Sequence, residues 1–122
     1  MLVGIDLIEL DRIERALKRH GERFKHRVFT EAERAYCDSK ANPAQSYAAR
    51  FAGKEAVGKA LGFGVYFTWQ EIEIAGRPKP GVRLSGRTLA VAERLGASKI
   101  DLSMTHSRGV AAAVAIVEIG QV

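Results

Sequence analysis

RFAGKEAVGKALG, at residues 50–62, closes the longest helical pattern in the chain. The pattern predicts a helix from Ala44 to about Leu61, in which alanines permit close packing against neighbouring elements. Gly62 and Gly64 follow directly and are predicted to end it. This helix is the element around which the rest of the chain is interpreted.

The charged side chains of this helix fall into stripes. Glu55 and Lys59 are four residues apart and share one face, and Arg50 and Lys54 form an adjoining stripe. One interpretation is a surface helix with an ordinary ion pair worth a few tenths of a kcal/mol. Two glycines inside the same helix favour another, because each costs about 1 kcal/mol relative to alanine. Small residues permit a ligand or a second chain to approach closely.

Patterning outside this helix predicts an α+β domain with a mainly antiparallel sheet, in the order β-α-α-α-β-β-α-β-β. The last strand is apolar enough to be buried on both faces. Another helix is expected after the capping box Thr30–Glu33, and Ser85 is expected to cap one that ends near Leu95. The strands are predicted over residues 2–7, 65–75, 82–84, 100–105 and 110–119, with a first helix from Glu9 to Gly21.

Length and composition narrow the class of protein. The 122 residues suit a single domain over 1–122, and the one cysteine, Cys37, fits a reducing compartment. No apolar run approaches the roughly 18 residues that span a bilayer, and the N-terminus lacks the basic region of a signal peptide. We therefore expect a cytoplasmic protein with no membrane association.

The formal net charge of +5 implies an acidic partner: nucleic acid, anionic lipid, an acidic protein or a phosphorylated ligand. Residues 12–27 hold five arginines and two lysines against Glu14 and Glu22. Such a run is often only a solvated face. Its arginine content suits recognition of carboxylates and phosphates through the planar guanidinium, which favours an acidic protein surface as partner.

Two further residues, Asp6 and His106, are candidates for binding a metal ion or a phosphate. Asp6 is predicted at the end of the first strand, where it either caps the following helix or serves as a metal ligand. Two carboxylates with substrate phosphates and waters form an ordinary Mg²⁺ site. His106 is predicted to begin a turn with Ser107, Arg108 and Gly109, either as a structural histidine or as part of a phosphate-binding turn.

Three segments together, GIDLIEL at 4–10, RFAGKEAVGKALG at 50–62 and SMTH at 103–106, resemble the phosphopantetheinyl transferases. They are most similar to the short bacterial holo-acyl-carrier-protein synthase class, essentially from end to end. The resemblance implies the 4′-phosphopantetheinyl transferase fold with one module per chain, assembled as a trimer with active sites between subunits. It also implies Mg²⁺-dependent transfer of 4′-phosphopantetheine from coenzyme A to a serine of apo-acyl-carrier-protein in fatty acid biosynthesis, releasing adenosine 3′,5′-bisphosphate.

The same resemblance assigns roles by position. Asp6 and Glu55 become the Mg²⁺ ligands, with Mn²⁺ as a possible substitute. Lys59 would contact the reacting phosphate, and Glu55 or a metal-bound water is the candidate base. The nucleotide phosphates are assigned to Arg50 and His106, the adenine region to Gly76 and Pro78, and the acidic carrier protein to Arg12, Arg15, Arg19 and Arg23.

Two departures from the family pattern stand out. Thr105 stands where a serine is common before the histidine. The GRPKPG loop at 76–81 is modified relative to a simple Gly-x-Pro turn. The second departure leaves the adenine contacts less determined than the metal site.

Two alternatives remain open at the level of sequence. The net charge and the arginine run are compatible with a small basic nucleic-acid-binding module. Its strands, however, lack an aromatic platform and its helices lack a helix-turn-helix pattern, so no nucleic acid partner is expected. The other alternative is an interaction subunit whose metal site has decayed, against which Asp6 and Glu55 are both present.

Overall fold

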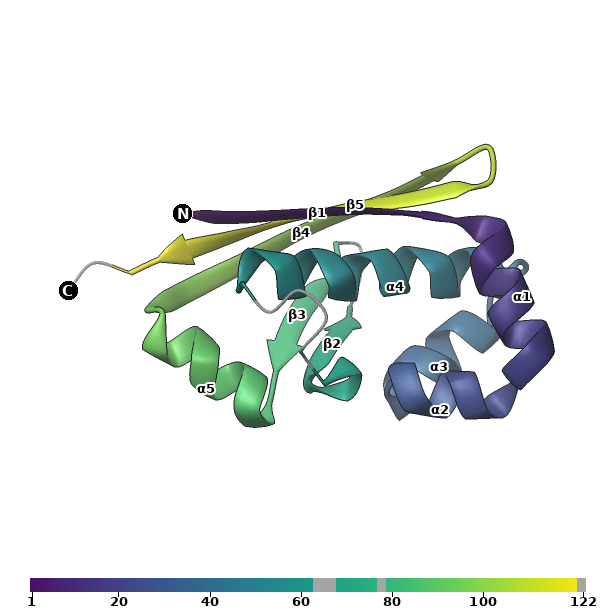
Figure 1. The fold of residues 1–122 in the computed structure, drawn as a ribbon, viewed down its shortest axis with the longest axis horizontal. Helices are drawn as coiled ribbons and strands as arrows, with labels where there is room; N and C mark the ends of the chain where they lie inside the picture. The colour runs from purple at the N-terminus through teal and green to yellow at the C-terminus, as the bar shows by residue number, and fades with distance from the viewer. Residues whose placement is uncertain (63–67, 77–78, 121–122) are drawn as a thin grey trace.

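A three-stranded antiparallel sheet with one long helix across its inner face forms the centre of the molecule (Figure 1). The computed structural model describes residues 1–62, 68–76 and 79–120. The sheet has the order β1 (Leu2–Glu9), β5 (Val110–Ile119), β4 (Ala97–Ser107). The helix is α4 (Pro43–Ala60), which agrees closely with the helix predicted from the sequence.

The remaining elements form two groups beneath the central layer (Figure 1). Three short helices lie at the N-terminal end of α4, and a two-stranded antiparallel sheet with one helix lies towards its other end. The first group is α1 (Leu10–His20), α2 (Glu22–Val28) and α3 (Glu31–Asp38); the second is the 3₁₀ turn η1 (Trp69–Glu71), β2 (Ile72–Ala75), β3 (Gly81–Leu84) and α5 (Gly86–Arg94).

The predicted α+β class and antiparallel pairing are confirmed. The capping box is also confirmed, because Thr30 Oγ1 accepts from Glu33 N and Glu33 Oε1 accepts from Thr30 N. The separate helix α2 was not predicted; Gly21, at φ 52°, ends α1 and allows the chain to turn directly into it. No helix in the described part of the chain is long and apolar enough to cross a bilayer.

Three local predictions are wrong. Residues 69–71 form a 3₁₀ turn, so only 72–75 of the predicted 65–75 strand pair as a strand, and 65–67 lie outside the described residues. The hairpin is shorter than expected, because β4 pairs with β5 as far as Ser107 opposite Val110 and places His106 in the strand. Ser85 precedes α5 but its side chain makes no cap; Glu71 accepts from Thr88 instead.

The last strand is not buried on both faces. Along β5, Ala111, Ala113, Ala115 and Val117 are buried beneath α4, whereas the alternating residues on the outer face are only half-buried. On the neighbouring β1, the outer side chains Val3, Ile5 and Leu7 are 58%, 67% and 64% exposed. Within the described residues, an apolar sheet face therefore lies open to solvent.

Glycine and alanine set how closely α4 approaches the sheet. A methyl group built on Gly4 of β1 would overlap the carbonyl oxygen of Ala56 and lie 2.6 Å from the backbone nitrogen of Ala60. Both neighbours are backbone atoms, which cannot turn aside as a flexible side chain can. The helix therefore rests directly on β1 at this point.

Replacing Gly4 with alanine is expected to lower the free energy of unfolding by about 3 kcal/mol, at the upper end of the usual cost of overpacking, because α4 must lift. Urea denaturation followed by circular dichroism measures the change. Gly81→Ala is the matched control, since the nearest neighbour of its added methyl is 3.8 Å away. Equal stability of the two variants would show that α4 does not rest on β1 in this way.

Candidate active site

Asp6, Glu55 and Lys59 come together where α4 crosses β1. Lys59 Nζ lies 2.9 Å from Asp6 Oδ1 and donates to the carbonyl oxygen of Ile5 at 3.1 Å. Asp6 lies in the middle of β1, on the face towards α4, and its side chain is 14% exposed. The position at a strand end and the helix-capping alternative are therefore both wrong, since β1 continues to Glu9.

Glu55 adds a second carboxylate to this cluster. Burial raises the pKa of the Glu55 carboxyl, and the nearby Asp6 charge raises it further, while Lys59 and Arg12 oppose the shift. Two carboxylates thus repel each other across a half-buried site that has one close ammonium group. A divalent cation bound between them would relieve that repulsion.

The donor set suits Mg²⁺. This ion is usually held by one or two carboxylates, with substrate phosphates and water completing its octahedral shell. Asp6 and Glu55 supply the carboxylates, and over residues 1–62, 68–76 and 79–120 no set of three His, Cys, Asp or Glu side chains is placed to enclose a metal ion. Two carboxylates are the number that the protein contributes to a Mg²⁺ site when a phosphorylated substrate and water supply the remaining oxygens.

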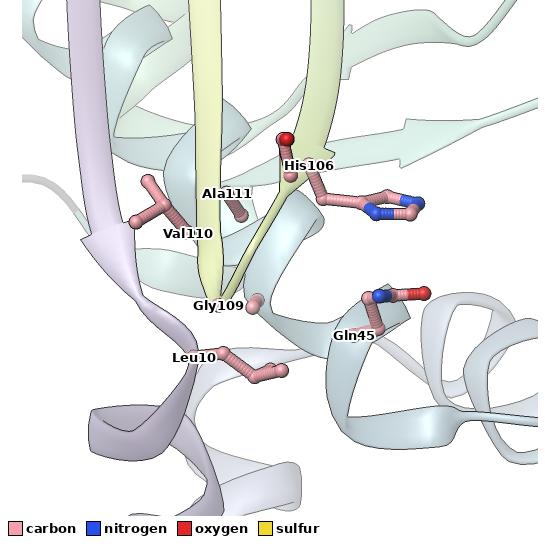
Figure 2. A pocket seen from close by; sticks show the side chains of 8 residues that line it. Leu10, Gln45, His106, Gly109, Val110 and Ala111 are labelled. Atoms are coloured by element: carbon pink, nitrogen blue, oxygen red, sulfur yellow. The ribbon is translucent and has the colours of Figure 1, made fainter.

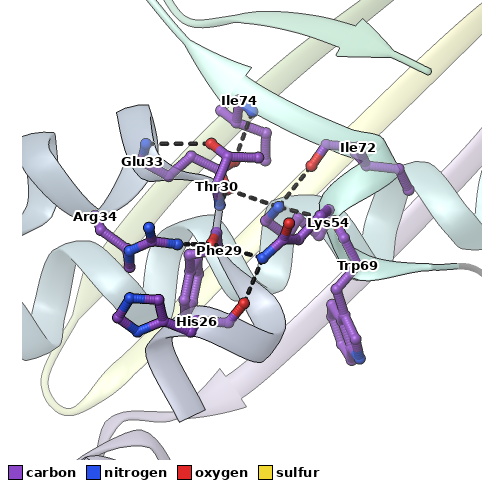
Figure 3. A network of polar contacts seen from close by, with 10 residues as sticks. His26, Phe29, Thr30, Glu33, Arg34, Lys54, Trp69, Ile72 and Ile74 are labelled. Carbon is purple, nitrogen blue, oxygen red and sulfur yellow. Dashed lines mark hydrogen bonds and ion pairs between the residues drawn. The ribbon is translucent and has the colours of Figure 1, made fainter. Parts of the chain in front are cut away.

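A buried ion pair on another flank of α4 connects this helix to α3 (Figure 3). Lys54 Nζ lies 2.7 Å from Glu33 Oε1, and both side chains are fully buried. Burial lowers the pKa of Lys54, against the raising effect of the Glu33 carboxylate. The sequence identified Glu33 only as half of a capping box and Lys54 only as a stripe residue, because the pair joins positions 21 residues apart.

Arg50 lies one turn before Lys54 and is 5% exposed. Its guanidinium carbon lies 4.0 Å from the centre of the Tyr36 ring, and Lys40 approaches the same ring at 4.6 Å. Arg50 Nε is a buried donor with no hydrogen-bond partner among the described residues. Lys40 was not singled out from the sequence; it contacts the Tyr36 ring from the segment that follows α3.

His106 lies near the hairpin end of β4, beside a small pocket (Figure 2). Figure 2 shows His106 and Gln45, from the first turn of α4, pointing out on the same side. Gly76 follows β2 with φ 101° and is exposed, whereas Pro78 lies outside the described residues.

The structure does not bring His106 and Arg50 to the carboxylate cluster. Asp6 and His106 belong to the two edge strands, β1 and β4, which β5 separates by two strand spacings, about 10 Å. On α4, Arg50 and Glu55 are five residues apart, a rotation of about 140° around the helix axis. One chain therefore presents two sets of predicted site residues on opposite flanks of α4.

Three of the four predicted carrier-binding arginines lie together on α1. Arg12, Arg15 and Arg19, with Ala16, line an open groove. Arg23 is exposed on α2 and is not part of that lining. Arg12 also opposes the raised pKa of the Glu55 carboxyl, so its positive charge acts on the carboxylate cluster.

The family model of the 4′-phosphopantetheinyl transferase superfamily matches residues 2–115. With the antiparallel sheet, the central helix and the Asp6–Glu55 carboxylates, this match defines a phosphopantetheinyl transferase.

Comparison with known proteins narrows the class of phosphopantetheinyl transferases to one family. The chain is 51% identical to the holo-(acyl-carrier-protein) synthase of Moorella thermoacetica, over 94% of this chain and 91% of that protein. It is 49% identical to that of Chlamydia trachomatis, over 95% and 98%. The crystal structure of the Helicobacter pylori enzyme in complex with coenzyme A superposes with a TM-score of 0.84 at 30% identity, covering 96% and 100%. The chain belongs to the holo-acyl-carrier-protein synthase family, as the sequence resemblance implied, and not to the nucleic-acid-binding class.

Changing Glu55 to glutamine is expected to lower transfer activity at least 100-fold, since an acid–base group contributes about 10² to 10⁴. The variant should nevertheless melt no lower than the wild type at neutral pH. Because the folded-state pKa of Glu55 is raised, ionisation of the carboxyl costs stability as pH rises through that value. The melting temperature of the variant relative to wild type should therefore increase with pH above the ordinary glutamate range.

Calorimetry from acidic to neutral pH measures this difference. A variant that melts below wild type throughout the range would mean that the Glu55 carboxylate stabilises the fold, contrary to its position beside Asp6.

Proposed function

We propose that this chain transfers 4′-phosphopantetheine with Asp6, Glu55 and Lys59 at the reacting phosphorus, as one transferase module over residues 1–122. The observation that supports this most strongly is the pair of carboxylates at the crossing of β1 and α4, with the Lys59 ammonium 2.9 Å from Asp6 Oδ1. Asp6 and Glu55 would hold Mg²⁺, and Mn²⁺ offers the same oxygen-ligand chemistry. When bound, the ion neutralises phosphate charge during transfer.

In the reaction, the serine hydroxyl oxygen of the carrier protein bonds to the phosphorus that bears pantetheine. The bond from this phosphorus to the oxygen of adenosine 3′,5′-bisphosphate breaks, and the serine proton leaves to a base, for which Glu55 is the candidate. Most of the rate comes from positioning and electrostatics, as in other phosphoryl transfers. Lys59 is 47% exposed, so its ammonium can reach a phosphate oxygen beside Asp6.

The nucleotide half of coenzyme A is assigned to a neighbouring chain. Arg50, His106, Gly76 and Pro78 were predicted for this half, and Arg50 and His106 lie away from the carboxylate cluster. A trimer with active sites between subunits, as the resemblance implies, would pair one chain's cluster with another chain's Arg50 and His106. The open apolar face of β1 and β5 supports such an assembly, because a face of this kind is usually covered by another chain.

The carrier protein is assigned to the basic face of α1 and α2. Arg12, Arg15, Arg19 and Arg23 present four guanidinium groups to an acidic partner, and the first of them also acts electrostatically on Glu55. A carrier docked there would bring its serine towards the reacting phosphorus. Fatty acid biosynthesis is the setting that the family indicates for such a carrier.

Intact-mass measurement of an apo-acyl-carrier-protein, incubated with the chain, coenzyme A and Mg²⁺, tests the proposal. The carrier should gain one phosphopantetheine, and EDTA should abolish the gain. Asp6→Asn should behave as wild type does in EDTA while remaining folded. Full modification in EDTA would contradict the metal role of Asp6 and Glu55.

Reversing charge in the groove, with Arg15→Glu and Arg19→Glu together, is expected to raise the KM for the carrier protein at least tenfold. The KM for coenzyme A should stay within twofold, because neither residue belongs to the nucleotide half. The effect should shrink at high salt, where exposed charges are screened over about 10 Å or less. Arg87→Glu and Arg94→Glu together, both exposed on α5, are the matched control for the same change in net charge, and an equal rise there would show that net charge alone is responsible.

A further inference from the structure

Both partners of the buried Glu33–Lys54 ion pair make further hydrogen bonds to the backbone (Figure 3). Besides Glu33, the Lys54 ammonium donates to the carbonyl oxygens of Trp69 at 2.9 Å and Ile72 at 2.6 Å. An ammonium group has three donors, and all three are used. The direction of the side chain is therefore fixed by three acceptors from different parts of the chain.

The carboxylate is held equally firmly. Glu33 Oε1 accepts from the Thr30 backbone N–H at 2.8 Å in addition to Lys54, and Oε2 accepts from the Ile74 N–H at 2.7 Å. The network thus connects the start of α3, the middle of α4, η1 and β2. Burying two charges costs so much desolvation that such a pair adds little net stability compared with apolar residues of similar size. What the network supplies is a fixed direction of the Lys54 side chain relative to α3 and β2.

Helix α4 needs such a restraint. Apart from Tyr47 and Val57, the uncharged residues that it buries are small: Ala48, Ala49, Ala52, Gly53, Ala56, Gly58 and Ala60. Small side chains allow close approach to the sheet, but they interlock weakly, because jigsaw packing is what selects a single arrangement. The large ring contacts of α4, from Tyr47 to Phe29 and from Phe51 to Phe24 and Trp69, come from residues at least one turn before Glu55. The Lys54 network acts next to Glu55 itself and adds a restraint there.

Rotation matters because of the residue that follows Lys54. Adjacent residues of a helix are about 100° apart, so the direction of Lys54 into the η1–β2 side sets the direction of Glu55 towards Asp6. At the radius of a side-chain tip, about 5–6 Å, a 10° rotation moves the Glu55 carboxylate by about 1 Å. An error of this size in a catalytic group can cost about 100-fold in rate.

We propose that Glu33 and Lys54 are positioning residues of the transferase: their buried pair fixes the axial rotation of α4 and so aims Glu55 and Lys59 at Asp6. The inference rests on the proposed roles of Asp6, Glu55 and Lys59. It assigns the two neighbours in the Lys54-Glu55 dipeptide separate tasks, one holding the helix and the other working at the reacting phosphate.

The test compares Lys54→Met, which leaves Glu33 buried without its partner, with the double variant Glu33→Leu/Lys54→Met, which removes both charges. The single variant should lose stability and the double variant should recover much of it. If the pair positions α4, kcat per folded molecule stays about 100-fold below wild type in both, with the KM for carrier protein unchanged. A double variant that regains the wild-type kcat together with its stability would overturn the proposal.

Two further variants keep the result interpretable. Lys54→Arg retains the charge but replaces a three-way donor by a planar fork, so it should fold and still lose kcat at least tenfold; wild-type kcat in a folded Lys54→Arg would also overturn the proposal. Val28→Ala, a buried truncation on α2, lowers stability without touching the pair and should keep the wild-type kcat per folded molecule.

Mn²⁺ binding, measured by electron paramagnetic resonance, supplies a readout independent of turnover. Loss of a residue that orients metal ligands typically weakens binding 10- to 100-fold, so the folded double variant should bind Mn²⁺ at least tenfold more weakly than wild type. Unchanged Mn²⁺ affinity in that variant would count against positioning. Asp6→Asn distinguishes failure of the proposed metal site from failure of the positioning role. If Asp6→Asn keeps the wild-type Mn²⁺ affinity, the proposed metal site is wrong. The kcat of the double variant then still decides whether Glu33 and Lys54 position α4.

Discussion

The contact between α4 and β1 at Gly4 is the constraint on which the site depends. Only a residue without a side chain lets the backbone of Ala56 and Ala60 approach the strand so closely. That approach places Glu55 and Lys59 of the helix over Asp6, two residues further along β1 on the same face. The raised pKa of Glu55 and the Lys59–Asp6 contact both follow from this short separation of helix and sheet.

The small residues that permit the approach leave few large apolar side chains on α4 close to Glu55, and a buried polar network holds the helix on the other flank. There, Lys54 and Glu33 are buried with every donor and acceptor satisfied. Arg50 continues that flank and lies against Tyr36. One helix therefore carries a charged cluster on one side and a buried polar network on the other, and it separates the two sets of residues that the family resemblance assigns to a single coenzyme A molecule.

Local patterns in the sequence predicted much of this arrangement. The alanine-rich run over 44–61 and the Thr30–Glu33 capping box are short-range signals, and both are confirmed. The Glu33–Lys54 pair was missed because it depends on the packing of α3 against α4, which no local pattern encodes. His106 was misplaced in a turn because Ser107 and Gly109 favour turns, whereas pairing with β5 extends the strand past it. The last strand was expected to be buried on both faces because it is apolar throughout. Within the described residues only its inner face is covered, by α4, and the composition of the strand does not indicate this.

We propose that Asp6 and Glu55 of one chain and Arg50 and His106 of another bind the same coenzyme A molecule. A crystal structure of the protein with coenzyme A and Mn²⁺, with anomalous data collected at the manganese edge, tests it directly. We expect an anomalous peak between Asp6 and Glu55, a pyrophosphate oxygen beside it, and the nucleotide of that molecule against Arg50 and His106 of a neighbouring chain. Manganese bound away from the two carboxylates, or a coenzyme A molecule held entirely by one chain, would contradict it.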